Sequence, residues 1–159
     1  MGSKTLVIAV DNSKECLKAL DFALQHLPNG YTYYIVHMQP RPYVSSIIAG
    51  AVAPEFAYQQ LEAFEKEMTA ASNKIMDAVF IPKAKSAGAE ACATVLKVES
   101  DSSSHIGTAI CDYAEKVKAV ALILMRQNKS AVSRFFMGSV TKFCAVHSTI
   151  PVIIVPETD

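Results

Sequence analysis

Short segments rich in aliphatic and aromatic residues alternate with amphipathic stretches along the chain, and this alternation limits the possible folds to a few. The segments are residues 6–10, 31–38, 91–98, 120–125 and 152–155. Runs of this length are typical of strands, and the unbroken apolar ones of strands covered on both faces. Strands that alternate with helices imply right-handed crossovers and a parallel sheet. We therefore predict an α/β fold, an open five-stranded parallel sheet with helices on both faces.

Between these segments, apolar residues recur every three or four positions, which predicts amphipathic helices. A first helix follows the first strand, and a long second helix begins near Pro54. Pro82 is expected to end or kink this long helix, because proline has no N–H to donate. A third helix follows the serine-rich loop 100–104, and a last one covers residues 138–146. No internal repeat interrupts this pattern, so the chain 1–159 is predicted to form a single domain.

The composition argues against several classes of protein. Lys plus Arg number 15, and Asp plus Glu also number 15. With a formal charge of zero, we expect neither nucleic acid nor an anionic membrane as a partner. No segment approaches the roughly 18 consecutive apolar residues of a spanning helix, and the first ten residues lack a secretory signal, so a cytoplasmic location is expected. The cysteines lack metal-ligand spacing, and we expect buried free thiols at Cys16, Cys92, Cys111 and Cys144.

The fold itself predicts where a ligand would bind. In open parallel sheets, ligands bind beyond the carboxyl ends of the strands, where the winding of the sheet reverses. The first and fourth strands are the most uniformly apolar and are expected at the centre. The site then comprises Asp11 with its two neighbours and residues 126–139. Asp11 also has an alternative role as a helix cap, with Glu15 placed to return a capping bond, and one carboxylate can serve both purposes.

The neutral total hides an uneven distribution of charge. Residues 116–156 contain six basic and no acidic side chains, whereas residues 1–115 contain nine basic and 13 acidic ones. Gly138 and Ser139 open the last helix, where free backbone N–H groups favour an anion by about 0.3–1 kcal/mol per charge. These features indicate a phosphate site for a small ligand. The alternative is a solvated basic surface.

Three segments of the chain resemble the universal stress protein family. Residues 9–13, Ala-Val-Asp-Asn-Ser, resemble the family's first strand, which ends in Asp, any residue, Ser. Residues 35–38 resemble its second strand. Residues 125–155 resemble its closing strand, loop, helix and strand. The resemblance covers essentially the whole chain. It implies a Rossmann-like, adenine nucleotide alpha hydrolase-like sheet, often dimeric, whose ATP-binding members hold the nucleotide at the ends of the first and fourth strands.

The resemblance also assigns roles to residues. It places Asp11, preceded by Val10, near the ribose and base, and Met38 near the base through its backbone. Without the resemblance, Met38 would be interpreted as a core residue. It places Gly138, Ser139 and Val140 near the phosphates. The alternative role of Ser139 is that of a helix cap.

The glycine spacing of the ATP-binding members is only partly present. Their pattern is glycine, two residues, glycine, nine residues, then Gly-Ser or Gly-Thr. Counting back from Gly138, the two earlier glycines fall on Met125 and Asn128. Asparagine tolerates positive φ, so Asn128 can preserve the turn, although its side chain can obstruct a phosphate. Arg126 and Lys129 can compensate by charge and hydrogen bonding. ATP, ADP and AMP, with or without Mg²⁺, all stay candidates.

Three functions are compatible with these residues. The first is a stress-response protein that binds an adenine nucleotide with little or no turnover. The second is a protein of the same fold that has lost nucleotide binding and acts as a dimeric interaction module, as the missing glycines at 125 and 128 suggest. The third is ATP hydrolysis, which needs a base and a metal ligand aimed at the phosphates. Only Asp11 is a candidate for these tasks, so we expect at most a slow ATPase and assign no catalytic residue.

The last strand predicts a homodimer. If residues 152–155 lie at the sheet edge, four apolar residues with open backbone groups need a cover. Pairing with the same strand of a second subunit would provide that cover by two-fold symmetry.

Overall fold

The computed structural model describes residues 2–11, 13–41, 54–126 and 138–156. In these ranges the chain forms a five-stranded parallel sheet in the order β3-β2-β1-β4-β5. The predicted fold class is therefore confirmed, with β1 and β4 as inner neighbours and β5 at one edge. The strands are β1 (Lys4–Val10), β2 (Tyr31–Pro40), β3 (Glu90–Val98), β4 (Ala121–Arg126) and β5 (Val152–Pro156).

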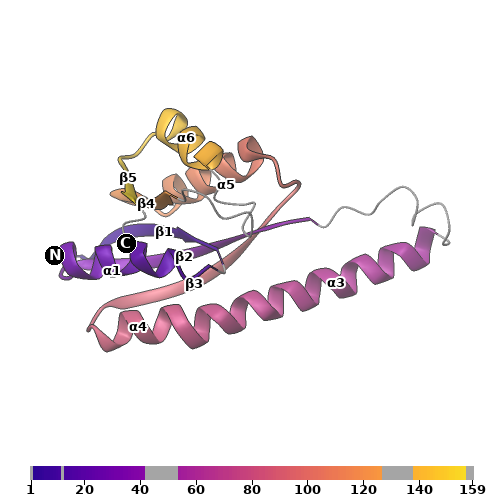
Figure 1. Ribbon diagram of the computed structural model, residues 1–159, viewed down its shortest axis with the longest axis horizontal. Helices are drawn as coiled ribbons and strands as arrows, with labels where there is room; N and C mark the ends of the chain where they lie inside the picture. The colour runs from indigo at the N-terminus through magenta and orange to yellow at the C-terminus, as the bar shows by residue number, and fades with distance from the viewer. Residues whose placement is uncertain (1, 12, 42–53, 127–137, 157–159) are drawn as a thin grey trace.

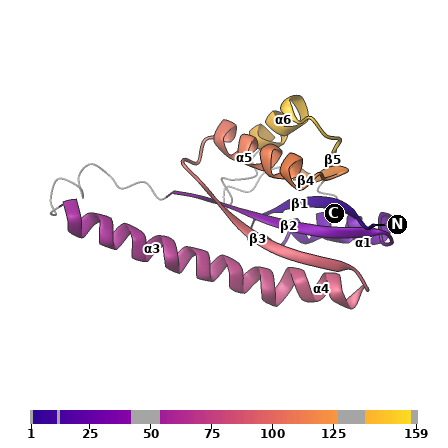
Figure 2. The ribbon, with the colours of Figure 1, turned by 180° about the vertical axis from the view of Figure 1, so that it is seen from behind.

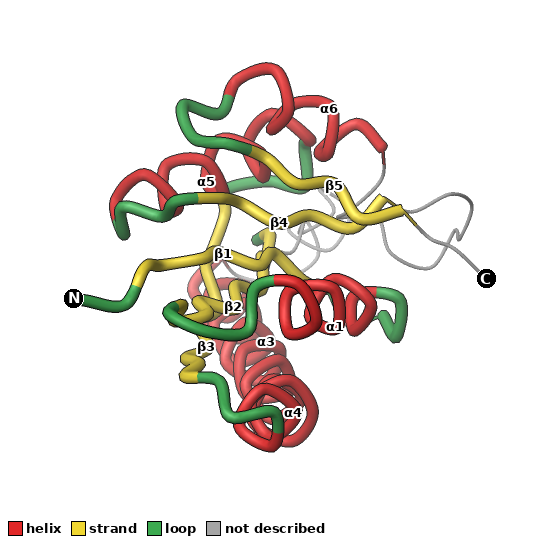
Figure 3. The backbone as a smooth tube through the Cα atoms, turned by 90° about the vertical axis from the view of Figure 1, so that its left-hand side faces the viewer, coloured by secondary structure: helices red, strands yellow, loops and turns green. Residues whose placement is uncertain are grey.

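Helices cover both faces of the sheet (Figure 3). On one face lie α1 (Cys16–His26) and a long helical segment; on the other lie α5 (Ser103–Lys116) and α6 (Gly138–His147). Side chains alternate between the two faces of a strand. In β1, Leu6 and Ile8 accordingly pack in the core under α1, whereas Val7 and Ala9 pack in the core under α5 and α6. This two-sided burial explains the unbroken apolar sequence of β1.

The long helical segment does not end at Pro82. It consists of α3 (Pro54–Ile75), a π-helical turn (Met76–Phe80) and α4 (Ile81–Ser86) in direct succession. Proline cannot donate to a carbonyl one turn earlier, and the wider π-helical turn accommodates that lost hydrogen bond just before Pro82. Of the two expected outcomes, an end or a kink at Pro82, an end is wrong, because the helical segment continues through Pro82 in α4.

The first half of α3 extends well beyond the ends of the strands (Figures 1 and 2). Polar contacts join this helix to the end of β2. The Gln39 amide donates to the carbonyl of Glu65 at 3.3 Å, and the Thr69 hydroxyl donates to Gln39 Oε1 at 3.1 Å. Arg41 pairs with Glu65 at 3.7 Å and with Glu99, after β3, at 3.2 Å. The helix is thus fixed near the carboxyl edge of the sheet.

The cysteines differ in exposure more than the sequence predicts. Cys16 and Cys144 are buried, Cys111 is half-buried and Cys92 is exposed; all four are free thiols. The expectation of a buried thiol was wrong for Cys92, which lies on β3, an edge strand of the sheet. Within the described ranges, no helix combines the length and the apolar character needed to cross a bilayer.

Candidate functional site

The carboxyl ends of the inner strands bring the predicted site residues to one edge of the sheet. β1 pairs with β2 from Lys4↔Tyr31 to Val10↔His37, and it pairs with β4 on its other side. Because all three strands are parallel, Asp11, directly after β1, and Arg126, the last residue of β4, lie at the same edge. Val10 is buried and Arg126 is exposed.

Asp11 is almost fully buried, with 2% of its surface exposed. Its Oδ1 accepts a hydrogen bond from the Ser13 N–H at 2.7 Å and another from the Cys16 thiol at 3.1 Å. The helix-cap role predicted for it was wrong. Helix α1 begins five residues later, at Cys16, and Glu15, at the cap position, makes no side-chain capping bond. Asp11 instead organises the turn that connects β1 with α1.

His37 lies beside this turn. Its Nδ1 is 3.3 Å from the carbonyl oxygen of Val10, and 5% of the residue is exposed. Burial lowers the pKa of His37, while the Val10 carbonyl and the negative charge of Asp11 act in the opposite direction with smaller effect. The lowered pKa leaves the imidazole mainly neutral at physiological pH. The next residue, Met38, packs its fully buried side chain in the core under α5 and α6.

The starts of α5 and α6 meet near the same edge. Ser102 caps α5 by accepting from the His105 N–H at 3.2 Å, as the serine-rich loop predicts. The Ser103 hydroxyl donates to the Ser139 hydroxyl at 2.7 Å, which joins the first turns of the two helices. Both helices follow the carboxyl ends of strands, so their first turns lie at the carboxyl edge of the sheet, the edge that also holds Asp11.

The first turn of α6 contains an exposed glycine, Gly138, and a buried valine, Val140. A Cβ built on Gly138 would meet no atom of the described structure within 4 Å. Ser139 is exposed, whereas Val140 is buried in the core under the two helices. The turn is therefore held by Val140, and none of the described residues covers the side of Gly138 where a Cβ would lie. Asn128 and Lys129 lie outside the described residues.

Three contributors to this region were missed by sequence reasoning. Cys16, Ser103 and His37 each contact or adjoin a predicted site residue through the tertiary structure. Ser103 belongs to a serine run that signalled only a cap. Cys16 lies among apolar residues, a context typical of core packing. No local pattern signals the contact of either residue.

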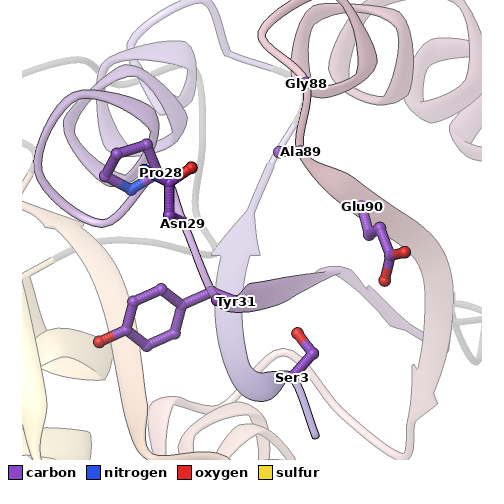
Figure 4. Close-up of a pocket in the computed structure, with 8 residues that line it drawn as sticks. Ser3, Pro28, Asn29, Tyr31, Gly88, Ala89 and Glu90 are labelled. Carbon is purple, nitrogen blue, oxygen red and sulfur yellow. The ribbon is translucent and has the colours of Figure 1, made fainter. Parts of the chain in front are cut away.

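The described residues include no cluster of three His, Cys, Asp or Glu side chains that could hold a metal ion. A cavity of about 250 Å³ lies at the opposite edge of the sheet, among the amino ends of the strands. Ser3, Tyr31 and Glu90 contribute to its lining (Figure 4). Because it lies at the other end of β1 from Asp11, this cavity is separate from the region built around Asp11 and Ser139.

The model of the Universal stress protein family matches residues 2–156. The chain belongs to the universal stress protein family. None of the curated proteins compared with this universal stress protein matches it in sequence.

Solved structures share its fold at low sequence identity. The hypothetical protein MJ0577 is 15% identical with a TM-score of 0.69, over 100% of this chain and 99% of its own. A family member from Arabidopsis thaliana with AMP bound is 15% identical, with a TM-score of 0.57 over 98% and 92% of the two chains. The universal stress protein from Archaeoglobus fulgidus in complex with dAMP is 23% identical, with a TM-score of 0.58 over 97% and 98%. The TM-scores over nearly the whole of each chain establish the common fold.

Proposed function

We propose that this universal stress protein binds an adenine nucleotide at the carboxyl ends of β1 and β4, and that it is a cytoplasmic stress-response protein with little or no catalytic turnover. One observation carries the proposal. A buried carboxylate, Asp11, is held by two hydrogen bonds at the end of β1, on the sheet edge where α6 begins with the open Gly138. Structures of the same fold with AMP and with dAMP support it.

In this proposal the two ends of the nucleotide meet different chemistry. Asp11 accepts hydrogen bonds from the ribose hydroxyls, while the backbones of Val10 and Met38 border the base. The phosphates lie at the first turn of α6, where Gly138 permits close approach and the N–H groups of Ser139 and Val140 attract negative charge. The basic residues that complement this charge are Arg126 and Lys129, with Asn128 in the turn between them.

The nucleotide in this proposal is AMP, ADP or ATP. Mg²⁺ would bind with it only through phosphate oxygens of the nucleotide. Glycine is absent from positions 125 and 128, which limits close backbone approach by a triphosphate and makes AMP and ADP alternatives to ATP. The chain 1–159 acts as one domain in this proposal.

Calorimetric titration with AMP, ADP and ATP, each with Mg²⁺ and with chelator, tests the proposal. We expect saturable binding that weakens in Asp11→Asn and in Ser139→Ala. Ser86→Ala is the matched control, because Ser86 is exposed at the end of α4, where its hydroxyl donates to the Lys83 carbonyl. Absence of binding at millimolar nucleotide would contradict the proposal, as would equal weakening by Ser86→Ala.

An interaction module that works as a homodimer is the second candidate function. The observation that favours it is the edge position of β5, which pairs with β4 on one side and leaves 40% of Ile154 exposed. Pairing of β5 with the same strand of a second subunit would cover the backbone edge of β5 and the Ile154 side chain. Nucleotide binding and dimerisation are compatible, because β5 lies at the sheet edge and Asp11 at the end of the central strand.

A further inference from the structure

Cys16 makes two hydrogen bonds to one residue, and that residue is Asp11. The Asp11 N–H donates to Cys16 Sγ at 3.3 Å, and the Cys16 thiol donates to Asp11 Oδ1 at 3.1 Å. The thiol thus closes a ring with the main chain and the side chain of Asp11. Cys16 is itself fully buried as the first residue of α1. The buried first residue of α1 therefore holds the Asp11 carboxylate in place.

The electrostatic environment keeps this thiol a donor. Burial, and next the negative charge of Asp11, raise the pKa of Cys16 to about 12. At physiological pH the sulfur therefore carries its proton and can donate it to the carboxylate. A thiolate at this position would instead repel Asp11. A buried hydrophobic side chain could fill the same space but could neither donate to Oδ1 nor accept from the Asp11 N–H.

We propose that Cys16 is a positioning residue for nucleotide binding: its thiol holds the Asp11 carboxylate in the orientation that receives the ribose hydroxyls. The inference rests on the proposed function. A carboxylate offers about four acceptor sites, so Asp11 can accept several hydrogen bonds at once. A carboxylate oriented before the ligand arrives loses less side-chain freedom on binding, which strengthens the complex.

Two substitutions separate positioning from packing. Cys16→Ser keeps a donor and acceptor on the same β-carbon, whereas Cys16→Ala removes both. We expect Cys16→Ala to weaken AMP binding about five- to tenfold, the equivalent of one net hydrogen bond, and Cys16→Ser to restore most of it. The matched control is Ile110→Val, a fully buried position in the other core. It should lower thermal stability and leave AMP affinity unchanged.

An AMP analogue without ribose hydroxyls distinguishes a role of Cys16 in positioning Asp11 from a general effect of Cys16 on the structure. The dissociation constants for AMP and for 2′,3′-dideoxyadenosine monophosphate are measured for wild type and the three variants. Positioning predicts that Cys16→Ala weakens AMP and leaves the dideoxy compound as in wild type. Equal AMP affinity of Cys16→Ala and wild type would overturn the inference, and so would equal weakening of both ligands.

Failure of the proposed function is recognised separately. If wild type binds neither compound, nucleotide binding is wrong and the role of Cys16 in it falls too. The infrared S–H stretching band that disappears in Cys16→Ala reports the contact without any ligand. It should move to higher frequency in Asp11→Asn, because a neutral amide oxygen accepts more weakly than a carboxylate. An unmoved band would overturn the hydrogen bond on which the inference depends.

Discussion

Around Asp11, burial determines which side chains carry charge. It raises the pKa of Cys16 and lowers that of His37, because a buried group disfavours its charged form in both cases. At neutral pH the thiol and the imidazole are therefore mainly uncharged, and both lie near the Asp11 carboxylate. The anionic character of this end of β1 thus comes from Asp11, while the neighbouring groups contribute hydrogen bonds.

The lowered pKa of His37 predicts a loss of stability in mild acid. The unfolded chain binds a proton on this residue below about pH 6.5, whereas the folded chain binds it only at lower pH. The unfolding free energy should therefore fall as the pH decreases from 7.5 to 5.5. Urea denaturation at both pH values measures the difference. We expect a smaller difference in His37→Asn and an unchanged one in His26→Gln, which alters an exposed histidine at the end of α1. Equal pH dependence in wild type and His37→Asn would contradict this assignment.

The four thiols should react at different rates with Ellman's reagent. Cys92 is exposed and should react first, while the half-buried Cys111 follows. Cys16 and Cys144 should react only on unfolding, because burial hides them and raises the pKa of both thiols. Thiol release is followed in native buffer and again in denaturant. A fast phase that persists in Cys92→Ser would show that another thiol is the accessible one.

At the scale of elements, the packing of α5 against α6 positions the first turn of α6. Gly107 on α5 lies directly against the Phe143 ring on α6: a Cβ at this position would be 2.3 Å from Phe143 Cδ1. The Cys144 thiol reaches the Gly107 carbonyl at 3.8 Å. The absence of a side chain at Gly107 therefore sets how close the two helices lie.

Gly107→Ala should destabilise the fold, although alanine favours helices by about 1 kcal/mol over glycine. The added methyl group forces α5 and α6 apart, and such overpacking opposes folding by about 1–3 kcal/mol. We expect a lower melting temperature in thermal denaturation, and weaker AMP binding because α6 carries Gly138. Thr108→Ala, an exposed neighbour on α5, should change stability by less than about 0.5 kcal/mol. A melting temperature of Gly107→Ala at or above that of wild type would contradict the packing argument.

Strands and helices could be predicted where the pattern of apolar residues along the sequence was regular. The runs at residues 6–10 and 120–125 predicted β1 and β4, because strands buried on both faces must be apolar throughout. Where the helix begins after β1, and the π-helical turn before Pro82, were not predictable in the same way. In both cases the course of the backbone depends on how a helix packs against the sheet, and the local sequence does not encode that packing.

For the molecule as a whole, the edge position of β5 should determine assembly. Ile154 is 40% exposed on this edge strand, and a lysine there would place a charge in a strand-to-strand interface. We expect Ile154→Lys to shift a dimer towards monomer in light scattering at micromolar concentration. Val79→Lys is the control, because Val79 is also 40% exposed but lies in the π-helical turn, which packs on one face of the sheet. A monomeric wild type, or an equal shift in both variants, would contradict dimerisation through β5.

The alternation of strands and helices, the central position of β1 and β4, and the family could all be predicted from the sequence. Those properties follow from the periodicity of burial and from short motifs, both of which are local. Three features depend on the packing in three dimensions: Asp11 binds the Cys16 thiol instead of capping α1, Ser103 meets Ser139, and Cys92 is exposed. These contacts join residues whose distance in space is set by how helices pack on the sheet. Hydrogen bonds of about 3 Å depend on that packing in three dimensions, and periodicity along one chain does not encode it.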